Sequence, residues 1–168
     1  MSMTNINEPL EPLNILYICT HNRCRSALSE AITNQLGNGL LLAKSAGSQP
    51  TGEVHPLTLK YLTQAGYNIA GLTSNSWQDT DYMGNFQPDV VITVCDNAAG
   101  ESCPLWLGVT PKLHWGLSDP SKNTTDAAQT AANFQQTITE IEERVAKLLA
   151  VAQLPLDQRI KALTELPQ

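Results

Sequence analysis

Long apolar runs are missing from this sequence, and so is any excess of basic residues. No segment approaches the roughly 20 consecutive apolar residues that a membrane-spanning helix needs, and residues 1–12 are polar, without an apolar signal region. The formal net charge of −6 disfavours a general binder of nucleic acid or of an anionic membrane. We therefore expect a cytoplasmic protein that binds neither nucleic acid nor membrane, with residues 1–12 as a disordered tail.

The rest of the composition is ordinary for a small globular protein. With 168 residues, of which 42% are hydrophobic and 15% charged, the chain is long enough for one core and short for a second domain. An acidic protein that handles an anion must bind it in a local pocket. Nothing in the apolar pattern demands a dimer, so a monomer is expected.

Apolar periodicity predicts strands and helices that alternate along the chain. Expected strands lie at 14–19, 40–45, 88–95 and 109–115, and expected helices at 24–36, 56–65 and 127–152, with a short extra helical turn within 156–166. This order predicts an α/β sandwich with a mostly parallel sheet. Such sheets bind ligands at the carboxyl ends of their strands, where both Cys19 and Cys95 fall.

Residues 19–26, here called the oxyanion loop, leave the first strand and enter the first helix with the pattern Cys-x5-Arg-Ser. Its backbone N–H groups, at the positive end of the helix macrodipole, can surround an oxyanion. The same field lowers the pKa of a cysteine and favours Cys19 as a thiolate nucleophile. Arg25 offers a planar fork to two anion oxygens, and Ser26 can hydrogen-bond the thiolate. The other expected oxyanion-binding residues are Thr20, His21, Asn22, Arg23 and Cys24.

A plainer interpretation would make Cys19 a buried residue at a strand end and Arg25 a solvated helix residue. The position of the motif between a strand and a helix argues against it. The loop resembles the phosphate-binding loop of the low-molecular-weight tyrosine phosphatases and of the arsenate reductases that share their fold, and the resemblance runs from about residue 14 to 150. It implies a three-layer α/β sandwich with a four-stranded sheet, a catalytic domain over 13–152 and a C-terminal extension over 153–168.

Both branches of this family need a general acid that protonates the departing oxygen. Asp119-Pro120 follows the last expected strand, where both branches place an Asp-Pro acid, although Asp-Pro is also a common turn pair. The phosphatases usually follow this pair with a tyrosine that grips aryl substrates. Here Ser121 and Lys122 follow, which weakens the phosphatase interpretation.

A second pair of cysteines favours the reductase branch. Phosphate ester hydrolysis needs one thiol and no electrons, whereas reduction of arsenate to arsenite takes two electrons from thiols. Cys95-x7-Cys103, followed by His114-Trp115-Gly116, resembles the redox segment of the arsenate reductases. The resemblance implies arsenic detoxification through a Cys19, Cys95 and Cys103 disulfide relay, reset by thioredoxin or a similar thiol reductant, with no cofactor. In the thioredoxin-coupled members the two redox cysteines lie one residue closer together, which leaves the electron donor open.

Several reductases of this type bind potassium beside the loop. The matching oxygen donors here would be Asn22, Glu30, Ser45 and Asn75. Because Asn75 stands where a carboxylate is expected, we predict weak or absent potassium binding and no other metal. Asn22 has a separate expected task, which is to hold the loop's shape by hydrogen bonds. The resemblance implies that Cys24 is a packing residue or an occasional thiol partner, and we expect the packing role.

Other protein classes fit the sequence less well. Cys-x4-Cys and Cys-x7-Cys spacings match zinc ribbons poorly, and a thioredoxin-like oxidoreductase would need a Cys-x-x-Cys motif, which is missing. A non-enzymatic arsenite sensor would have no use for Arg25 and Asp119 in an oxyanion site. The remaining alternative is a low-molecular-weight protein tyrosine phosphatase.

Overall fold

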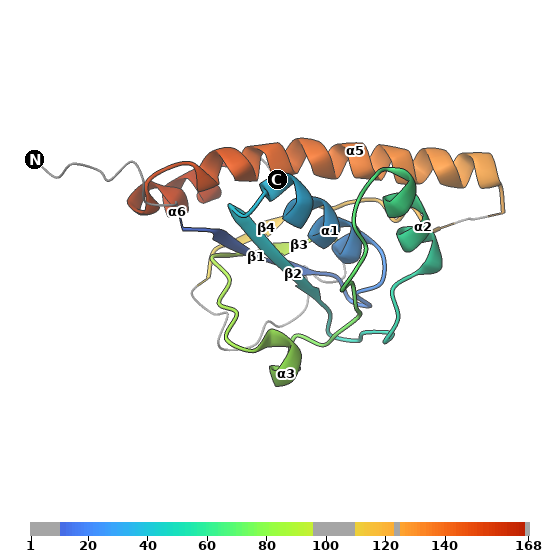
Figure 1. Ribbon diagram of the computed structural model, residues 1–168, viewed down its shortest axis with the longest axis horizontal. Coiled ribbons are helices and arrows are strands. Elements are labelled where there is room, and N and C mark those ends of the chain that lie inside the picture. The colour runs from blue at the N-terminus through green and yellow to red at the C-terminus, as the bar shows by residue number, and fades with distance from the viewer. Residues whose placement is uncertain (1–10, 96–109, 123–124, 167–168) are drawn as a thin grey trace, which may run out of the picture.

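The computed structural model describes residues 11–95, 110–122 and 125–166, and these form a sheet covered by helices (Figure 1). The strands are β1 (Leu13–Ile18), β2 (Leu41–Ala46), β3 (Val90–Thr93) and β4 (Lys112–His114). The helices are α1 (Arg25–Gly37), α2 (Pro56–Gln64), α3 (Thr80–Met83), α5 (Ala127–Ala152) and α6 (Leu156–Thr164). The predicted order of these elements is therefore confirmed, with α3 as an addition and with ends that differ by at most three residues.

The sheet has the order β2-β1-β3-β4, and every pairing between its strands is parallel. The apolar β1 and β3 lie at the centre, and all four residues of β3 are buried. The α/β class and the four-stranded sheet are confirmed, and within the described residues the sheet is wholly rather than mostly parallel. Parallel strands end at the same edge, which brings the segments after β1, β3 and β4 together.

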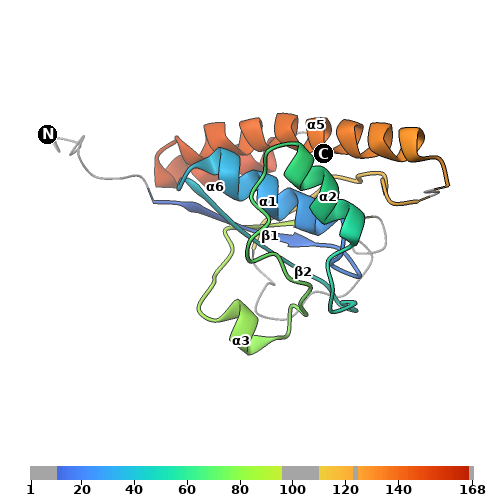
Figure 2. The same ribbon diagram turned by 45° about the vertical axis from the view of Figure 1, so that its right-hand side comes forward.

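Helices cover the two faces of the sheet unequally. Helices α1, α2 and α5 lie on one side, and the short helix α3 lies on the other (Figures 1 and 2). Helix α5 buries an apolar stripe against the sheet and α1, formed by Phe134, Ile138, Ile141, Val145 and Leu148. Its Phe134 ring stacks on Tyr61 of α2 at 4.7 Å. The four residues of α3 were not predicted, because a single turn capped by Asp79 leaves no periodic pattern.

The predicted extra turn after α5 is a nine-residue helix, α6, that packs back onto α5. Its Leu163 belongs to the main core, and its Arg159 is 5% exposed. The Arg159 guanidinium donates to the carbonyls of Ala152 (2.6 Å), Leu154 (3.3 Å) and Glu11 (2.7 Å). A cation at the end of α5 also complements the helix dipole. The division of the chain at residue 152 stays a prediction, as does the tail, of which residues 1–10 lie outside the described residues.

None of the helices within the described ranges is both long and apolar enough to cross a membrane.

We predict that Arg159→Met lowers the free energy of unfolding by about 2–4 kcal/mol, because three carbonyl groups lose a charged donor. Urea denaturation followed by circular dichroism measures this change. Lys161→Met is the matched control, since Lys161 is exposed on the same helix. Equal stability of the two variants would contradict a structural role for Arg159.

Candidate active site

The oxyanion loop is shaped by hydrogen bonds that pull its carbonyl groups outward. The donors are backbone N–H groups of the segment after β2, with Gln49 bound to Thr20 O (2.9 Å), Thr51 to His21 O (3.2 Å) and His55 to Arg23 O (2.9 Å). The hydroxyls of Ser74 and Thr58 donate to the His21 and Arg23 carbonyls as well. Because a trans peptide points its N–H opposite to its C=O, this anchoring turns N–H groups toward the loop interior. The result suits an oxyanion.

Asn22 holds the loop closed from within. It has a φ of 47°, in the left-handed region, and is fully buried. Its side-chain amide donates to Ser26 Oγ (2.8 Å) and Ser45 Oγ (2.9 Å), and its Oδ1 accepts the N–H of Asn75 at 2.8 Å. The predicted hydrogen bond across the loop is therefore confirmed. Ser26 accepts a hydrogen bond here, and its contact with the Cys19 thiolate stays a prediction.

A close backbone contact behind the loop was not predicted from the sequence. Gly47 follows β2, and a Cβ at this position would lie 2.4 Å from the carbonyl oxygens of both Cys19 and Thr20. No side chain fits there, so glycine is required for the segment after β2 to reach the loop. In the sequence, Gly47 lies just after the expected strand at 40–45. It gives no sign of the partner, because the two segments meet only in the folded sheet.

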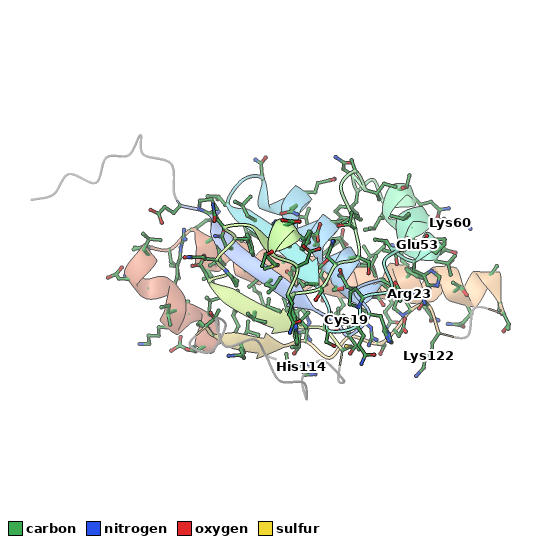
Figure 3. The ribbon with its side chains drawn as sticks, turned by 90° about the horizontal axis from the view of Figure 1, so that it is seen from below. Cys19, Arg23, Glu53, Lys60, His114 and Lys122 are labelled. Atoms are coloured by element: carbon green, nitrogen blue, oxygen red, sulfur yellow. The ribbon has the colours of Figure 1, made fainter. Side chains whose placement is uncertain are left out.

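The structure brings Cys19 and Cys95 together at the carboxyl edge of the sheet. Both are buried free cysteines, and Cys19 lies just beyond the strand tips in Figure 3. The Cys19 side chain is hydrogen-bonded with that of Cys95 and receives the backbone N–H of His21. Cys95 Sγ also lies 3.9 Å from Thr20 Oγ1. The predicted placement of both cysteines at strand ends is thus confirmed. Cys103 lies outside the described residues.

The prediction of a low pKa for Cys19 is wrong for this anion-free structure. The hydrogen bond between the Cys19 thiol and Cys95, and then burial, raise the pKa of Cys19 above its ordinary value. The Arg25 charge and the His21 N–H lower it, but by less. The sequence argument considered the loop and the helix dipole alone. It left out a second thiol from a strand more than 70 positions away.

Arg25 and Asp119 face each other across an active-site cleft of about 620 Å³. Arg25 Nη1 donates to the Leu117 carbonyl (3.0 Å), and Nη2 lies 3.9 Å from Asp119 Oδ2. Its Nε is buried and has no hydrogen-bond partner among the described residues, so this donor is available to an anion. The cleft is lined by His21, Arg25, Cys95, Gly116, Leu117, Ser118, Asp119 and Lys122.

The carboxyl of Asp119 is held ionised in this structure. Burial raises its pKa, but hydrogen bonds from the Ser121 hydroxyl and N–H, together with the charges of Arg25 and Lys122, outweigh burial and place the pKa below its usual value. The Ser121 contacts are 2.6 Å and 2.9 Å, both to Oδ1. A bound anion would engage Arg25 and set a like charge beside Asp119, which raises its proton affinity.

Cys24 is buried in the oxyanion loop, away from solvent. Burial raises the pKa of its thiol to about 12, and its side chain is hydrogen-bonded with the hydroxyls of Thr58 and Ser121. A protonated, enclosed thiol is a poor nucleophile. This geometry agrees with the predicted packing role.

Known proteins with this arrangement identify the family. The low-molecular-weight phosphotyrosine protein phosphatase family matches residues 14–161, which span the oxyanion loop, both described strand-end cysteines and Asp119. The chain belongs to this family.

Similar members of the family are named as reductases. An arsenate reductase of Bacillus licheniformis is 33% identical over 133 residues, which cover 79% of this chain and 92% of the relative. A glutaredoxin arsenate reductase of Synechocystis sp. is 28% identical over 139 residues, 81% of this chain and 95% of the relative. The solved structure of a thioredoxin-dependent arsenate reductase of Corynebacterium glutamicum matches with a TM-score of 0.62 and 30% identity, covering 84% of this chain and 63% of that one.

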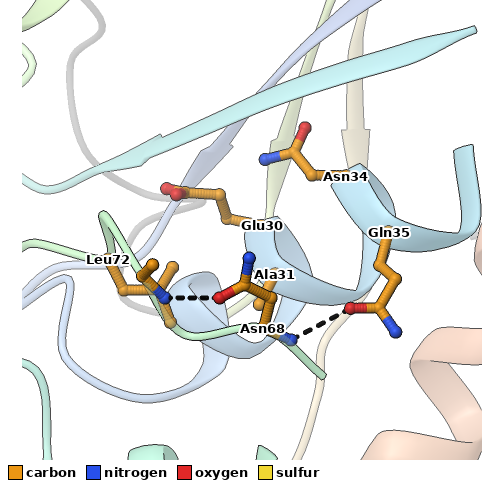
Figure 4. A pocket seen from close by; sticks show the side chains of 7 residues that line it. Glu30, Ala31, Asn34, Gln35, Asn68 and Leu72 are labelled. Atoms are coloured by element: carbon orange, nitrogen blue, oxygen red, sulfur yellow. Dashed lines mark hydrogen bonds between the residues drawn. The ribbon is translucent and has the colours of Figure 1, made fainter. Parts of the chain in front are cut away.

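The donors that the sequence proposed for potassium do lie together beside the loop. Ser45 Oγ donates to Glu30 Oε1 (2.8 Å), and both connect through Asn22 to Asn75. Glu30 borders a pocket of about 270 Å³ on the flank of α1 (Figure 4). Burial raises the pKa of Glu30 to about 7, against the hydrogen bonds from Ser45 and Tyr82 and the charge of Lys44. Weak potassium binding stays a prediction.

The zinc alternative finds no support in the described residues. Within those ranges, no three His, Cys, Asp or Glu side chains converge in a way that could hold a metal ion. His114 Nδ1 instead shares a hydrogen bond of 2.7 Å with the Thr93 hydroxyl.

Replacement of Cys95 by alanine tests the cause of the raised Cys19 pKa. Cys95→Ala removes the hydrogen bond that raises it most, so we expect the alkylation of Cys19 by iodoacetamide at pH 7 to become about tenfold faster. Mass spectrometry assigns the label to Cys19. Cys95→Ser, which keeps a hydrogen-bonding group, should give a smaller change, and an unchanged rate in Cys95→Ala would refute the explanation.

Glu30 should make stability depend on pH in a definite direction. Because its folded pKa is raised from 4.5 to about 7, its protonated form stabilises the fold below pH 4.5, and this contribution is lost as the pH rises through 7. Relative to Glu30→Gln, the parent should lose about 3 kcal/mol of unfolding free energy over that range.

Urea denaturation of both proteins in choline chloride measures the effect, and the same series in potassium chloride tests the cation. Weak potassium binding predicts the same loss in both salts. A smaller loss in potassium chloride would show that potassium compensates the Glu30 charge.

Proposed function

We propose that this chain is an arsenate reductase that converts arsenate to arsenite in arsenic detoxification. One observation supports this most strongly, which is the contact between the Cys19 and Cys95 thiols at the oxyanion loop. Hydrolysis of a phosphate ester requires one thiol, whereas a second thiol in contact with the first can supply electrons. The relatives named as arsenate reductases point to the same chemistry.

In the first step, the oxyanion loop binds arsenate through its N–H groups and Arg25. The Cys19 thiolate attacks the arsenic atom, an S–As bond forms, and one As–O bond breaks. The departing hydroxyl takes a proton from Asp119 and leaves as water. The buried, unpartnered Nε of Arg25 supports this assignment, since an anion in the loop gives that donor a partner.

In the second step, two electrons pass from the thiols to arsenic. The Cys95 thiolate attacks Cys19 Sγ, so an S–S bond forms and the S–As bond breaks with its electron pair on arsenic. Arsenic is thereby reduced by two electrons and leaves as arsenite, while two thiols are oxidised to the Cys19–Cys95 disulfide. In the anion-free site, the Cys19 and Cys95 thiols are hydrogen-bonded to each other, and this contact raises the pKa of Cys19. The two sulfur atoms are thus already close together before the substrate binds.

In the third step, Cys103 attacks Cys95 and releases the Cys19 thiolate. An external dithiol then reduces the Cys95–Cys103 disulfide. A thiol reductant is supported by both kinds of relative, one thioredoxin-dependent and one named for glutaredoxin. We propose thioredoxin or a similar dithiol protein, and a cytoplasmic location, where thiols are kept reduced. A monomer remains our expectation.

The alternative, a low-molecular-weight protein tyrosine phosphatase, would use the same loop and the same acid. Residual hydrolysis of aryl phosphates is therefore compatible with a reductase. The two functions differ in whether Cys95 and Cys103 are required.

We predict that Cys95→Ser and Cys103→Ser each lower arsenate turnover with thioredoxin at least about 100-fold, because the disulfide relay is broken. Hydrolysis of p-nitrophenyl phosphate by the same proteins should persist within about threefold, since it needs Cys19, Arg25 and Asp119 alone. Cys19→Ser is the control that should abolish both activities. If both variants reduce arsenate at the parental rate, the relay is wrong.

A further inference from the structure

Ser121 holds the carboxylate of Asp119 with two hydrogen bonds. Ser121 donates both its hydroxyl (2.6 Å) and its N–H (2.9 Å) to Asp119 Oδ1. Both donors reach the same oxygen. The other oxygen, Oδ2, is the one that lies 3.9 Å from Arg25. The carboxylate is therefore fixed in rotation, with Oδ2 toward the cation that an arsenate would contact.

The Ser121 hydroxyl has one proton, and it donates this proton to Asp119 Oδ1. The N–H of the same residue donates to the same oxygen. Both donors of Ser121 are therefore used on the acid.

We propose that Ser121 is a positioning residue that presents Asp119 Oδ2 as the proton-donating oxygen. The proposal rests on the proposed function, in which Asp119 is the acid. Ser121 has no contact with the anion in this scheme, and it acts through Asp119.

The Ser121 hydrogen bonds also change the pKa of Asp119, and a pH profile can detect this change. Each Ser121 hydrogen bond stabilises the ionised form of Asp119, so the serine orients the acid while making it release its proton more readily. Removal of the hydroxyl should raise the pKa of Asp119 and move the alkaline limb of the reaction to higher pH. The rate should nevertheless fall, because Oδ2 is no longer held toward Arg25.

The experiment measures single-turnover arsenite release from fully reduced enzyme, without an external reductant, as a function of pH. Ser121→Ala should lower the maximal rate about tenfold with an unchanged half-saturating arsenate concentration and move the alkaline limb upward. Ser121→Thr keeps the hydroxyl and should restore both the rate and the pH limb.

A carbon-13 NMR titration of the Asp119 carboxyl provides a readout that needs no activity. A higher Asp119 pKa in Ser121→Ala than in the parent is expected, and an unchanged pKa together with an unchanged rate would overturn the positioning role. Asp119→Asn separates this result from a failure of the proposed function. If that variant keeps the parental rate, Asp119 is not the acid and the positioning role fails with it. If the parent releases no arsenite, the reductase function itself fails.

Discussion

The anchoring of the oxyanion loop by the segment after β2 is the constraint on which the site depends. Gln49, Thr51 and His55 donate to the carbonyls of Thr20, His21 and Arg23, and this turns peptide N–H groups toward the loop interior. The contact is possible because Gly47 has no side chain between the two segments. An anion site made of backbone donors therefore requires little positive side-chain charge. This explains how a chain with a net charge of −6 can handle an oxyanion.

Two requirements compete at Cys19. A nucleophile should be a thiolate, which favours a low pKa, whereas a relay requires a second thiol within contact of the first. The structure satisfies the second requirement, and the Cys95 contact raises the pKa of Cys19 in the anion-free state. Arg25 and the His21 N–H counter this effect, so the site depends on its cation and its backbone donors for reactivity. Asp119 shows the reverse balance, since its neighbours outweigh burial and keep it ionised.

The nucleophile follows the central strand β1, whereas the acid follows the edge strand β4. Arg25 lies toward Asp119 from the oxyanion loop, and Ser121 holds the same carboxylate from its own loop. Because parallel strands end at one edge, loops after β1, β3 and β4 can converge without a long connection. Ser121, which belongs to no recognisable motif in the sequence, is thus placed to control the orientation of the acid.

The sequence by itself determined the α/β class, the order of strands and helices, and the Cys-x5-Arg-Ser loop, because apolar periodicity and motif spacing are local properties. Cys19 and Cys95 could be placed at strand ends, and Asp119 after the last strand, for the same reason. Only the tertiary structure decided that Gly47 supports the loop, that Ser121 holds Asp119, and that Cys19 has a raised pKa. These features depend on burial and on contacts between segments far apart in the chain. Local sequence predicts neither of these.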